Sequence, residues 1–334
     1  MKKLLTILLC LLVLIGCSSQ PKQSFDGKDR PSVCGRLQVI DGRLCDKNGN
    51  PVMLRGVSNN GVSVSRSFSN EDSYKDISHF LGANIYRLAL YTYGVGSVGY
   101  CTGGDKNLLM QDIIDGVEWG RRQDMYILID WHILSDGNPN KYIDEAKIFF
   151  DEVSKKCAKA ENVIYEICNE PNKCSWDDIK AYAEVIIPII RANDPESLII
   201  VGTPNWSQDV DVAAQDPLNY DNIMYTLHFY SATHKQELRD KAKSAMSRGL
   251  PLFVTEFGIT ASSGGYPVDE DEANVWIDFL EESGISYVMW NFARTGEPCA
   301  ALNFASLKTK DLTEEDLTRA GKWLLDTIAS RSRK

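Results

Sequence analysis

The sequence lacks the short motifs that define several large protein classes. None of its nine cysteines forms a C-x-x-C pair, which argues against a zinc ribbon or a thioredoxin-type redox site. Its four histidines form no H-x-H or H-E-x-x-H pattern, and no G-x-G-x-x-G motif follows the first predicted strand at residues 52–58. A dinucleotide fold and a metal centre have no local support, and we predict neither a metal nor another cofactor.

Basic residues are scarce relative to acidic ones. The 334 residues include 36 Lys and Arg against 46 Asp and Glu, which gives a formal net charge of −10. An acidic chain is a poor candidate for binding nucleic acid or an anionic lipid surface, because both are negatively charged. A neutral polymer is a more suitable partner.

The amino terminus has the pattern of an exported lipoprotein. Lys2 and Lys3 precede an apolar run at 4–15, which is too short to span a bilayer comfortably and is typical of a signal peptide. The run closes on L-I-G-C, which resembles the bacterial lipobox, where the cysteine is lipidated and becomes the mature N-terminus. That cysteine is Cys17; the alternative is a plain signal peptide with an incidental cysteine.

These patterns divide the chain into three parts. We predict a signal peptide at 1–16, a polar tether at 17–32 that begins with the lipidated cysteine, and one domain at 33–330. We expect the protein to be exported and lipid-anchored to the cell membrane, or to the outer membrane if the source is Gram-negative, facing outside the cytoplasm. No composition shift indicates a second domain, and we expect a monomer.

Seven cysteines lie beyond the signal peptide and the lipobox. An exported protein meets an oxidising compartment, so we expect some of them to be paired. The local candidates are Cys34 with Cys45 and Cys168 with Cys174, and for Cys168 a free thiol is an equal alternative. The odd count leaves at least one free thiol.

Eight short apolar runs recur along the chain, separated by amphipathic stretches with helical spacing. The runs lie at 52–58, 84–90, 126–131, 163–168, 198–203, 223–230, 251–258 and 285–290, and helices are predicted at 141–160, 176–192 and 314–330 among others. Strands buried on both faces that alternate eight times with helices predict an α/β fold, a single (β/α)8 TIM barrel. Residues 33–50 carry D-G and N-G turn signals and predict a small N-terminal hairpin that caps the bottom of the barrel.

Polar and aromatic residues gather where the predicted strands end. In a barrel of this kind the working residues lie at the C-terminal ends of the strands. The residues at or near those ends are Arg87, Asp130, Trp131, His132, Asn169, Glu170, His228, Tyr230, Glu256, Trp290 and Asn291.

The two glutamates among these residues, Glu170 and Glu256, lie at the ends of the fourth and seventh predicted strands. Cleavage of a glycosidic bond needs such a pair, because one acid protonates the leaving oxygen while the other attacks or activates water. Their pKa values must differ, and Arg87 and His228 are candidates for tuning them. The ordinary alternative is an acid that caps a helix or pairs with a surface base. Glu166 lies one turn deeper and is predicted to form a buried ion pair.

Six segments in chain order resemble glycoside hydrolase family 5, in its bacterial endoglucanase branch. They are IYRLALYT, ILIDWHILSDGNPN, VIYEICNEP, VGTPNWSQDV, TLHFY and LFVTEFG, and the resemblance runs from about residue 33 to 305. It implies a retaining endo-β-1,4-glucanase, a cellulase that hydrolyses internal bonds of cellulose or related β-glucans by double displacement without a metal.

The resemblance also implies a role for each matching residue. Glu170, in the Asn-Glu-Pro motif, matches the general acid/base, and Glu256 matches the nucleophile. Asn169 would hold the 2-hydroxyl of the attacked sugar. Arg87 and Tyr230 would hydrogen-bond the nucleophile and keep it ionised.

Four further matches would line the cleft. His132 and His228 would lie along it, His228 near the acid/base. Trp290 would form the platform under the sugar being cleaved, and Trp206 a stacking surface on the leaving-group side, because a pyranose offers an apolar face to an aromatic ring.

The sequence departs from the branch after the first strand. Endoglucanases of this branch carry His and Trp in a stretch like S-H-G-L-Q-W, whereas this chain has Asn60 and Val64 there. Arg294 and Thr295 also stand near a position where the branch often has Lys. Asn60 remains a candidate for substrate binding, but the loss of the ring leaves mannan, xyloglucan and mixed-linkage glucan open as substrates.

Two readings from other classes remain. One is a surface lipoprotein that binds glycans without cleaving them, although such a protein has no use for groups that support a nucleophile. The other is a metal-dependent barrel hydrolase with Asp130, His132 and His228 as ligands, which the missing metal motifs disfavour.

Overall fold

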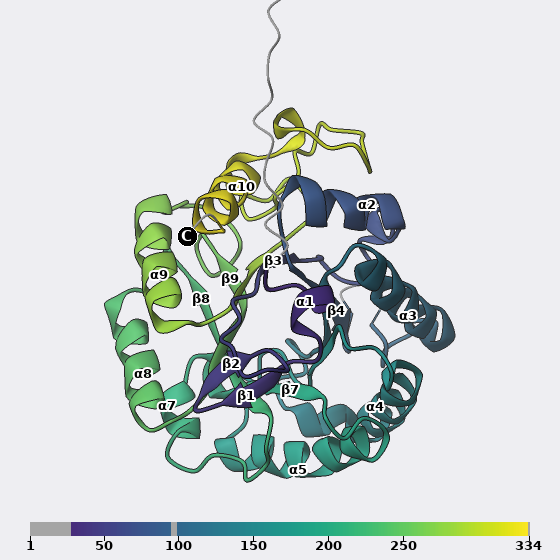
Figure 1. Cartoon of the computed structure of the whole chain (residues 1–334), viewed down its shortest axis with the longest axis vertical. Helices are drawn as coiled ribbons and strands as arrows, with labels where there is room; N and C mark the ends of the chain where they lie inside the picture. Colours follow the sequence, from purple (N-terminus) through teal and green to yellow (C-terminus); the bar gives the residue numbers. More distant parts are fainter. Residues whose placement is uncertain (1–27, 95–98, 333–334) are drawn as a thin grey trace, which may run out of the picture.

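The computed structural model describes residues 28–94 and 99–332, which form a closed barrel of eight parallel strands (Figure 1). The strands are β3 (Arg55–Ser58), β4 (Ile85–Tyr91), β5 (Tyr126–His132), β6 (Val163–Glu166), β7 (Leu198–Val201), β8 (Ile223–Tyr230), β9 (Leu252–Gly258) and β10 (Tyr287–Trp290). They follow one another in chain order, and β10 closes the barrel by pairing with β3. The predicted (β/α)8 barrel is confirmed.

Helices surround the barrel in Figure 1 and cover its outer face. They are α2 (Glu71–Lys75), α3 (Lys106–Arg122), α4 (Ile143–Cys157), α5 (Trp176–Asn193), α6 (Pro204–Ser207), α7 (Val210–Ala213), α8 (Gln236–Ser247), α9 (Glu270–Ser283) and α10 (Arg319–Arg331). The last helix begins later than predicted, because the Thr318 side chain accepts a hydrogen bond from Gly321 N and caps it there. None of the helices in the described ranges is long and apolar enough to cross a membrane.

The predicted hairpin is present and covers one end of the barrel. Strand β1 (Gln38–Ile40) pairs antiparallel with β2 (Arg43–Cys45), and together with α1 (Pro31–Cys34) it lies across the barrel end that faces the viewer in Figure 1. Cys34, Leu37 and Leu44 pack there against the first inward-pointing side chains of the barrel strands. This closed end is the N-terminal end of the strands, so the opposite end is the open one.

The folded domain begins before the predicted boundary at residue 33. Arg30 is buried and donates hydrogen bonds to Ser78 Oγ and to the carbonyl oxygen of Asp124. The part of the predicted tether from Asp29 onward therefore belongs to the domain, whereas the signal peptide 1–16 and Cys17 lie outside the described residues.

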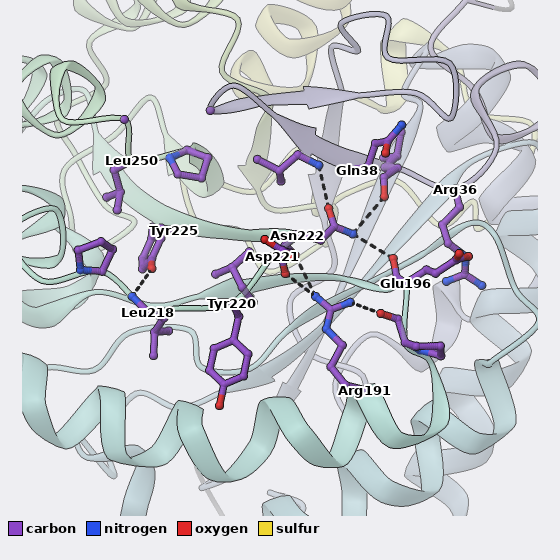
Figure 2. A pocket seen from close by; sticks show the side chains of 18 of the residues that line it. Arg36, Gln38, Arg191, Glu196, Leu218, Tyr220, Asp221, Asn222, Tyr225 and Leu250 are labelled. Atoms are coloured by element: carbon purple, nitrogen blue, oxygen red, sulfur yellow. Dashed lines mark hydrogen bonds between the residues drawn. The ribbon is translucent and has the colours of Figure 1, made fainter.

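A polar groove runs along the seam between the hairpin and the barrel (Figure 2). Asn222 joins the two sides: its side chain accepts from Val39 N and donates to the carbonyl oxygens of Leu37 and Glu196. The Arg191 guanidinium donates hydrogen bonds to carbonyl oxygens of neighbouring loops, those of Pro195, Asp221 and Asn222. The polar groups of Asn222 and Arg191 are thus paired within the protein, and the hydrogen bonds of Asn222 fasten the hairpin to the barrel.

Both predicted disulfides are wrong: all seven cysteines of the described residues are free thiols. Cys168 packs in the core beside Gly202, whereas the Cys174 thiol points to the carbonyl oxygen of Gly137. Cys34 serves as a small apolar contact in the cap. Proximity in sequence did not bring these sulfurs together, because each one fills a separate packing position.

A G-x-G-x-x-G string does occur at 94–99, after β4. Among the residues that the structure describes, the next helix, α3, begins only at Lys106, so it does not start directly at the glycine motif as the helix of a dinucleotide site does.

Candidate active site

The barrel interior carries a charged layer above its apolar bottom layer. Side chains that alternate along each strand place Arg87 on β4, Asp130 on β5 and Glu166 on β6 in this layer, and none of the three is exposed. Arg87 lies 3.0 Å from Asp130 Oδ2, and its Nε donates to Glu166 Oε2 at 2.8 Å. The predicted ion pair of Glu166 is thus present, and one guanidinium serves several buried carboxyl groups.

Glu256 enters this layer from β9 through a β-bulge. Thr226 pairs with Phe253 but His228 pairs with Glu256, so β9 holds one residue more than β8 in this stretch. The bulge turns both Thr255 and Glu256 to the barrel interior, although neighbouring strand residues ordinarily point to opposite faces.

The Glu256 carboxylate is held at both oxygens. Arg87 Nη1 donates to Oε2 at 2.9 Å and the Tyr230 hydroxyl to Oε1 at 2.8 Å. Burial is the main cause that raises the pKa of Tyr230 well above its usual value, so the phenol keeps its proton and remains a donor. A cation and a neutral donor together fix the position of the Glu256 carboxylate.

Glu170 lies just beyond β6, at the open end of the barrel. Its backbone is pinned to the neighbouring strand, because the N–H groups of Asn169 and Glu170 donate to the carbonyl oxygens of Trp131 and Ile133. The Ser207 hydroxyl donates to the carbonyl oxygen of Asn169. Burial raises the pKa of Glu170 to about 8, an effect that Arg87 partly offsets. Glu170 therefore carries a proton at neutral pH.

The two carboxyl groups face each other across a small space. One oxygen of Glu170, one oxygen of Glu256 and a ring nitrogen of His228 all lie within 4.8 Å of one another. Asp130 and His132 do not join His228 in any comparable group of three donors within the described ranges. An oxygen–oxygen distance within 4.8 Å is compatible with the roughly 5–5.5 Å spacing of the carboxyl groups in a retaining glycosidase and is shorter than the roughly 6.5–9.5 Å gap of an inverting one.

His132 and Asn169 form one wall of this space. His132 Nδ1 lies 2.6 Å from Asp130 Oδ2, and burial lowers the pKa of His132 to about 3, so the ring is neutral. The Asn169 amide donates to the carbonyl oxygen of Ile133 and accepts from Arg87 Nη2 at 2.6 Å. Its second N–H points to His132 Nε2 at 3.4 Å, a distance too long for a strong hydrogen bond.

Aromatic residues accompany the loops and strands that carry the carboxyl pair. Trp290 stacks on His132 with ring centroids 5.3 Å apart, and Tyr91 packs against the same histidine at 4.2 Å. Trp206 is 43% exposed, and its backbone N–H donates to the carbonyl oxygen of Pro171. Its φ of 57° is left-handed, as are those of its two neighbours, which is unusual for residues other than glycine. This strained turn holds an exposed indole beside the Glu170 loop.

The loop after β3 lacks a comparable ring. Val64 is 57% exposed and lies next to Gly61, which touches the Tyr91 ring. Asn60 is half-buried, and its N–H donates to Ser65 Oγ, a contact within the loop. Arg294 packs over the Phe68 ring and donates to the carbonyl oxygen of Ser306. The residues that depart from the family pattern therefore lie together, in the loops that follow the neighbouring strands β3 and β10.

Sequence reasoning missed two residues of this site. Tyr91 follows the predicted strand 84–90, and its parity with Arg87 and Ala89 could have found it. Thr255 could not be found in this way, because strand periodicity places it on the face opposite Glu256 and only the bulge brings both inside.

A closed (β/α)8 barrel with two opposed carboxyl groups and neighbouring aromatic rings at its open end defines a glycoside hydrolase. The model of the cellulase family, glycosyl hydrolase family 5, matches residues 45–296, and the chain belongs to this family.

Relatives of known name agree with this assignment. An endoglucanase from Clostridium saccharobutylicum is 43% identical over 329 residues, which cover 97% of this chain and 71% of that protein. Endoglucanase A from Butyrivibrio fibrisolvens is 42% identical and covers 88% of this chain and 69% of its own length. The solved catalytic domain of an endoglucanase from Thermobifida fusca, in complex with cellotetraose, has a TM-score of 0.84 at 33% identity and covers 89% of this chain and 98% of that one.

Proposed function

We propose that the protein is a retaining endo-β-1,4-glucanase whose acid/base is Glu170 and whose nucleophile is Glu256. The observation that carries the proposal is the contrast between two adjacent carboxyl groups. Glu256 accepts hydrogen bonds from Arg87 and Tyr230 at its two oxygens, whereas Glu170 is buried against a neutral histidine and keeps its proton. The endoglucanase relatives supply the substrate class.

In the first half-reaction Glu256 attacks the anomeric carbon and the glycosidic C–O bond breaks. The proton of Glu170 goes to the leaving oxygen, so the departing chain leaves as a neutral alcohol. In the second half-reaction Glu170, now ionised, takes a proton from water as the water oxygen attacks the anomeric carbon. Glu256 leaves as a carboxylate, and the configuration is retained.

The other polar groups hold the sugar. The weakly engaged N–H of Asn169 is available to the 2-hydroxyl of the attacked sugar, where a hydrogen bond gains strength in the transition state. Trp290 and Trp206 offer ring faces to pyranose units on the two sides of the scissile bond. His132 orients Asn169, and His228 contacts Glu170 directly.

Glu170→Gln is expected to abolish hydrolysis of a soluble β-glucan, because its unactivated leaving group needs protonation, and to spare the first step on an aryl cellobioside with an acidic phenol. In the wild type, kcat/KM should fall as the pH rises through about 8, where Glu170 loses its proton. The variant should lack this basic limb on the aryl substrate. Equal loss on both substrates, with the limb retained, would contradict the acid/base role.

Val64→Trp is expected to lower KM for cello-oligosaccharides by about threefold to tenfold with little change in kcat, because a ring at this edge stacks on a sugar in ground and transition states alike. Val275→Trp on the exposed face of α9 is the matched control. Steady-state kinetics on cello-, manno- and xylogluco-oligosaccharides would test this together with the polymer preference. A variant that gains only on mannan would favour that alternative substrate.

We also propose that the protein is exported and lipid-anchored through Cys17. The support is the basic start, the short apolar run and the L-I-G-C ending. Cys17→Ala should remove fatty-acid labelling and shift the activity out of the detergent-extracted membrane fraction, whereas Cys10→Ala, inside the apolar run, should leave both unchanged. Labelling that persists in Cys17→Ala would refute the anchor.

A further inference from the structure

A continuous chain of hydrogen bonds connects Glu170 at the open end with Glu166 in the charged layer. His228 Nδ1 lies 3.0 Å from Glu170 Oε1, and His228 Nε2 lies 2.9 Å from Thr255 Oγ1. The Thr255 hydroxyl in turn donates to Glu166 Oε1 at 2.6 Å. All members of the chain are buried, and nothing in the proposed reaction uses Glu166 or Thr255.

The donor and the acceptor in each hydrogen bond of this chain can be assigned. The Thr255 hydroxyl has one proton, which it gives to Glu166, so its oxygen must accept from its other neighbours. The Thr226 hydroxyl, 2.5 Å away, accepts from Thr255 N–H and is free to donate to Thr255 Oγ1. His228 Nε2 must then carry the ring proton. Burial lowers the pKa of His228 to about 4, so the ring is neutral and Nδ1 is bare.

A bare Nδ1 can only accept a hydrogen bond, and its neighbour is Glu170 Oε1. The resting chain is complete when Glu170 is protonated and donates to this nitrogen, whereas an ionised Glu170 faces a lone pair.

We propose that Glu166 is a positioning residue that acts through Thr255 and His228 to keep Glu170 in its protonated form. The inference rests on the proposed function of Glu170 as the acid/base. Glu166 touches neither the sugar nor the reacting atoms. Its charge orients the Thr255 hydroxyl, the hydroxyl selects the tautomer of His228, and the tautomer sets the hydrogen bond that Glu170 makes.

The charges around the chain are compatible with this assignment. Burial raises the pKa of Glu166 to about 7, an effect that Arg87 partly offsets because its Nε donates to the other oxygen of Glu166, so Glu166 is ionised at the pH of the basic limb near 8. The remaining titratable groups around Glu166 and Glu170 lie on β4, β5, β8 and β9, and they are Tyr91, Asp130, His132, Tyr230 and Glu256. The charges of Asp130 and Glu166 raise the pKa of Glu170, in the same direction as the hydrogen bonds from Glu166 to His228.

Thr255→Val tests the proposal, because it removes one hydroxyl and retains the shape and the charge of Glu166. Without an acceptor at Nε2, His228 is free to place its proton on Nδ1 and donate it to an ionised Glu170. The basic limb of kcat/KM should therefore move to lower pH by about one unit. Thr203→Val is the matched control, since Thr203 is equally buried and its hydroxyl donates to the carbonyl oxygen of Thr226 rather than to a member of the hydrogen-bond chain.

A direct readout is the ¹⁵N spectrum of the histidine rings. The wild type should show His228 protonated at Nε2, and Thr255→Val should show a shift toward Nδ1. Glu166→Gln should move the basic limb in the same direction, but Thr255→Val remains decisive if that variant is too unstable to study.

An unchanged basic limb in Thr255→Val, or an Nδ1-protonated His228 in the wild type, would overturn the proposal. Failure of the proposed function is distinguishable, because the basic limb would then persist in Glu170→Gln. If Glu170 is the acid/base but the hydrogen-bond chain from Glu166 has no effect on it, Glu170→Gln removes the basic limb while Thr255→Val leaves the limb at its wild-type pH.

Discussion

Glu256→Gln is expected to lower kcat on a soluble β-glucan by about 10⁴-fold while the protein remains folded. The amide keeps the volume of the side chain but has no negative charge to attack the anomeric carbon, so no covalent intermediate forms. The lost charge was also the partner of Arg87, which retains Asp130 and Glu166. The measurement is turnover on the polymer, together with thermal unfolding.

Glu282→Gln, an exposed change on α9, is the control and should leave turnover unchanged. A second test uses Glu256→Gly with azide. The small anion can enter the vacated space and attack from the same face, so the product should be the α-glycosyl azide. Near-wild-type turnover in Glu256→Gln, or a β-azide product, would exclude Glu256 as the nucleophile.

Arg87→Gln is expected to lower the free energy of unfolding by about 3–5 kcal/mol, because removing the only cation among several buried carboxyl groups leaves their charges uncompensated. Arg87 is not exposed at all and contacts Asp130, Glu166 and Glu256. Urea unfolding near pH 7 would measure the loss. The loss should shrink as the pH falls, since protonation of the carboxyl groups removes the charge that lacks a partner.

Arg55→Gln provides the comparison. Arg55 forms a two-point ion pair with Glu281, but both side chains keep some contact with solvent. Water can replace the lost partner there, so about 1 kcal/mol is expected. Equal losses in the two variants would show that burial does not govern the cost.

Strand periodicity was sufficient to predict much of the charged layer. Arg87, Asp130 and Glu166 lie at positions that alternate with apolar residues on strands buried on both faces, and a barrel leaves such residues only its interior. The same periodicity places Thr255 and Glu256 on opposite faces. It failed at β9 because a bulge depends on the register with both neighbouring strands, which no single segment encodes.

The cysteines and Trp206 show a second limit of prediction from the sequence. Pairing of Cys168 with Cys174 was a guess from short separation, but a thiol beside Gly202 is also a well-packed small side chain. The exposure of Trp206 depends on three successive left-handed residues, which propensities alone would not predict. Tertiary packing decided both outcomes.

The position of α1 at the closed end of the barrel sets how an attached molecule would be oriented. The chain enters the domain near Asp29 and Arg30, whose contacts with Asn84 and Asp124 lie just ahead of β4 and β5. The carboxyl pair lies at the other end of the same strands. A lipid, a bead or a fused protein joined ahead of Asp29 would therefore be attached behind the catalyst, and the mouth of the barrel would face outward to meet an approaching polysaccharide.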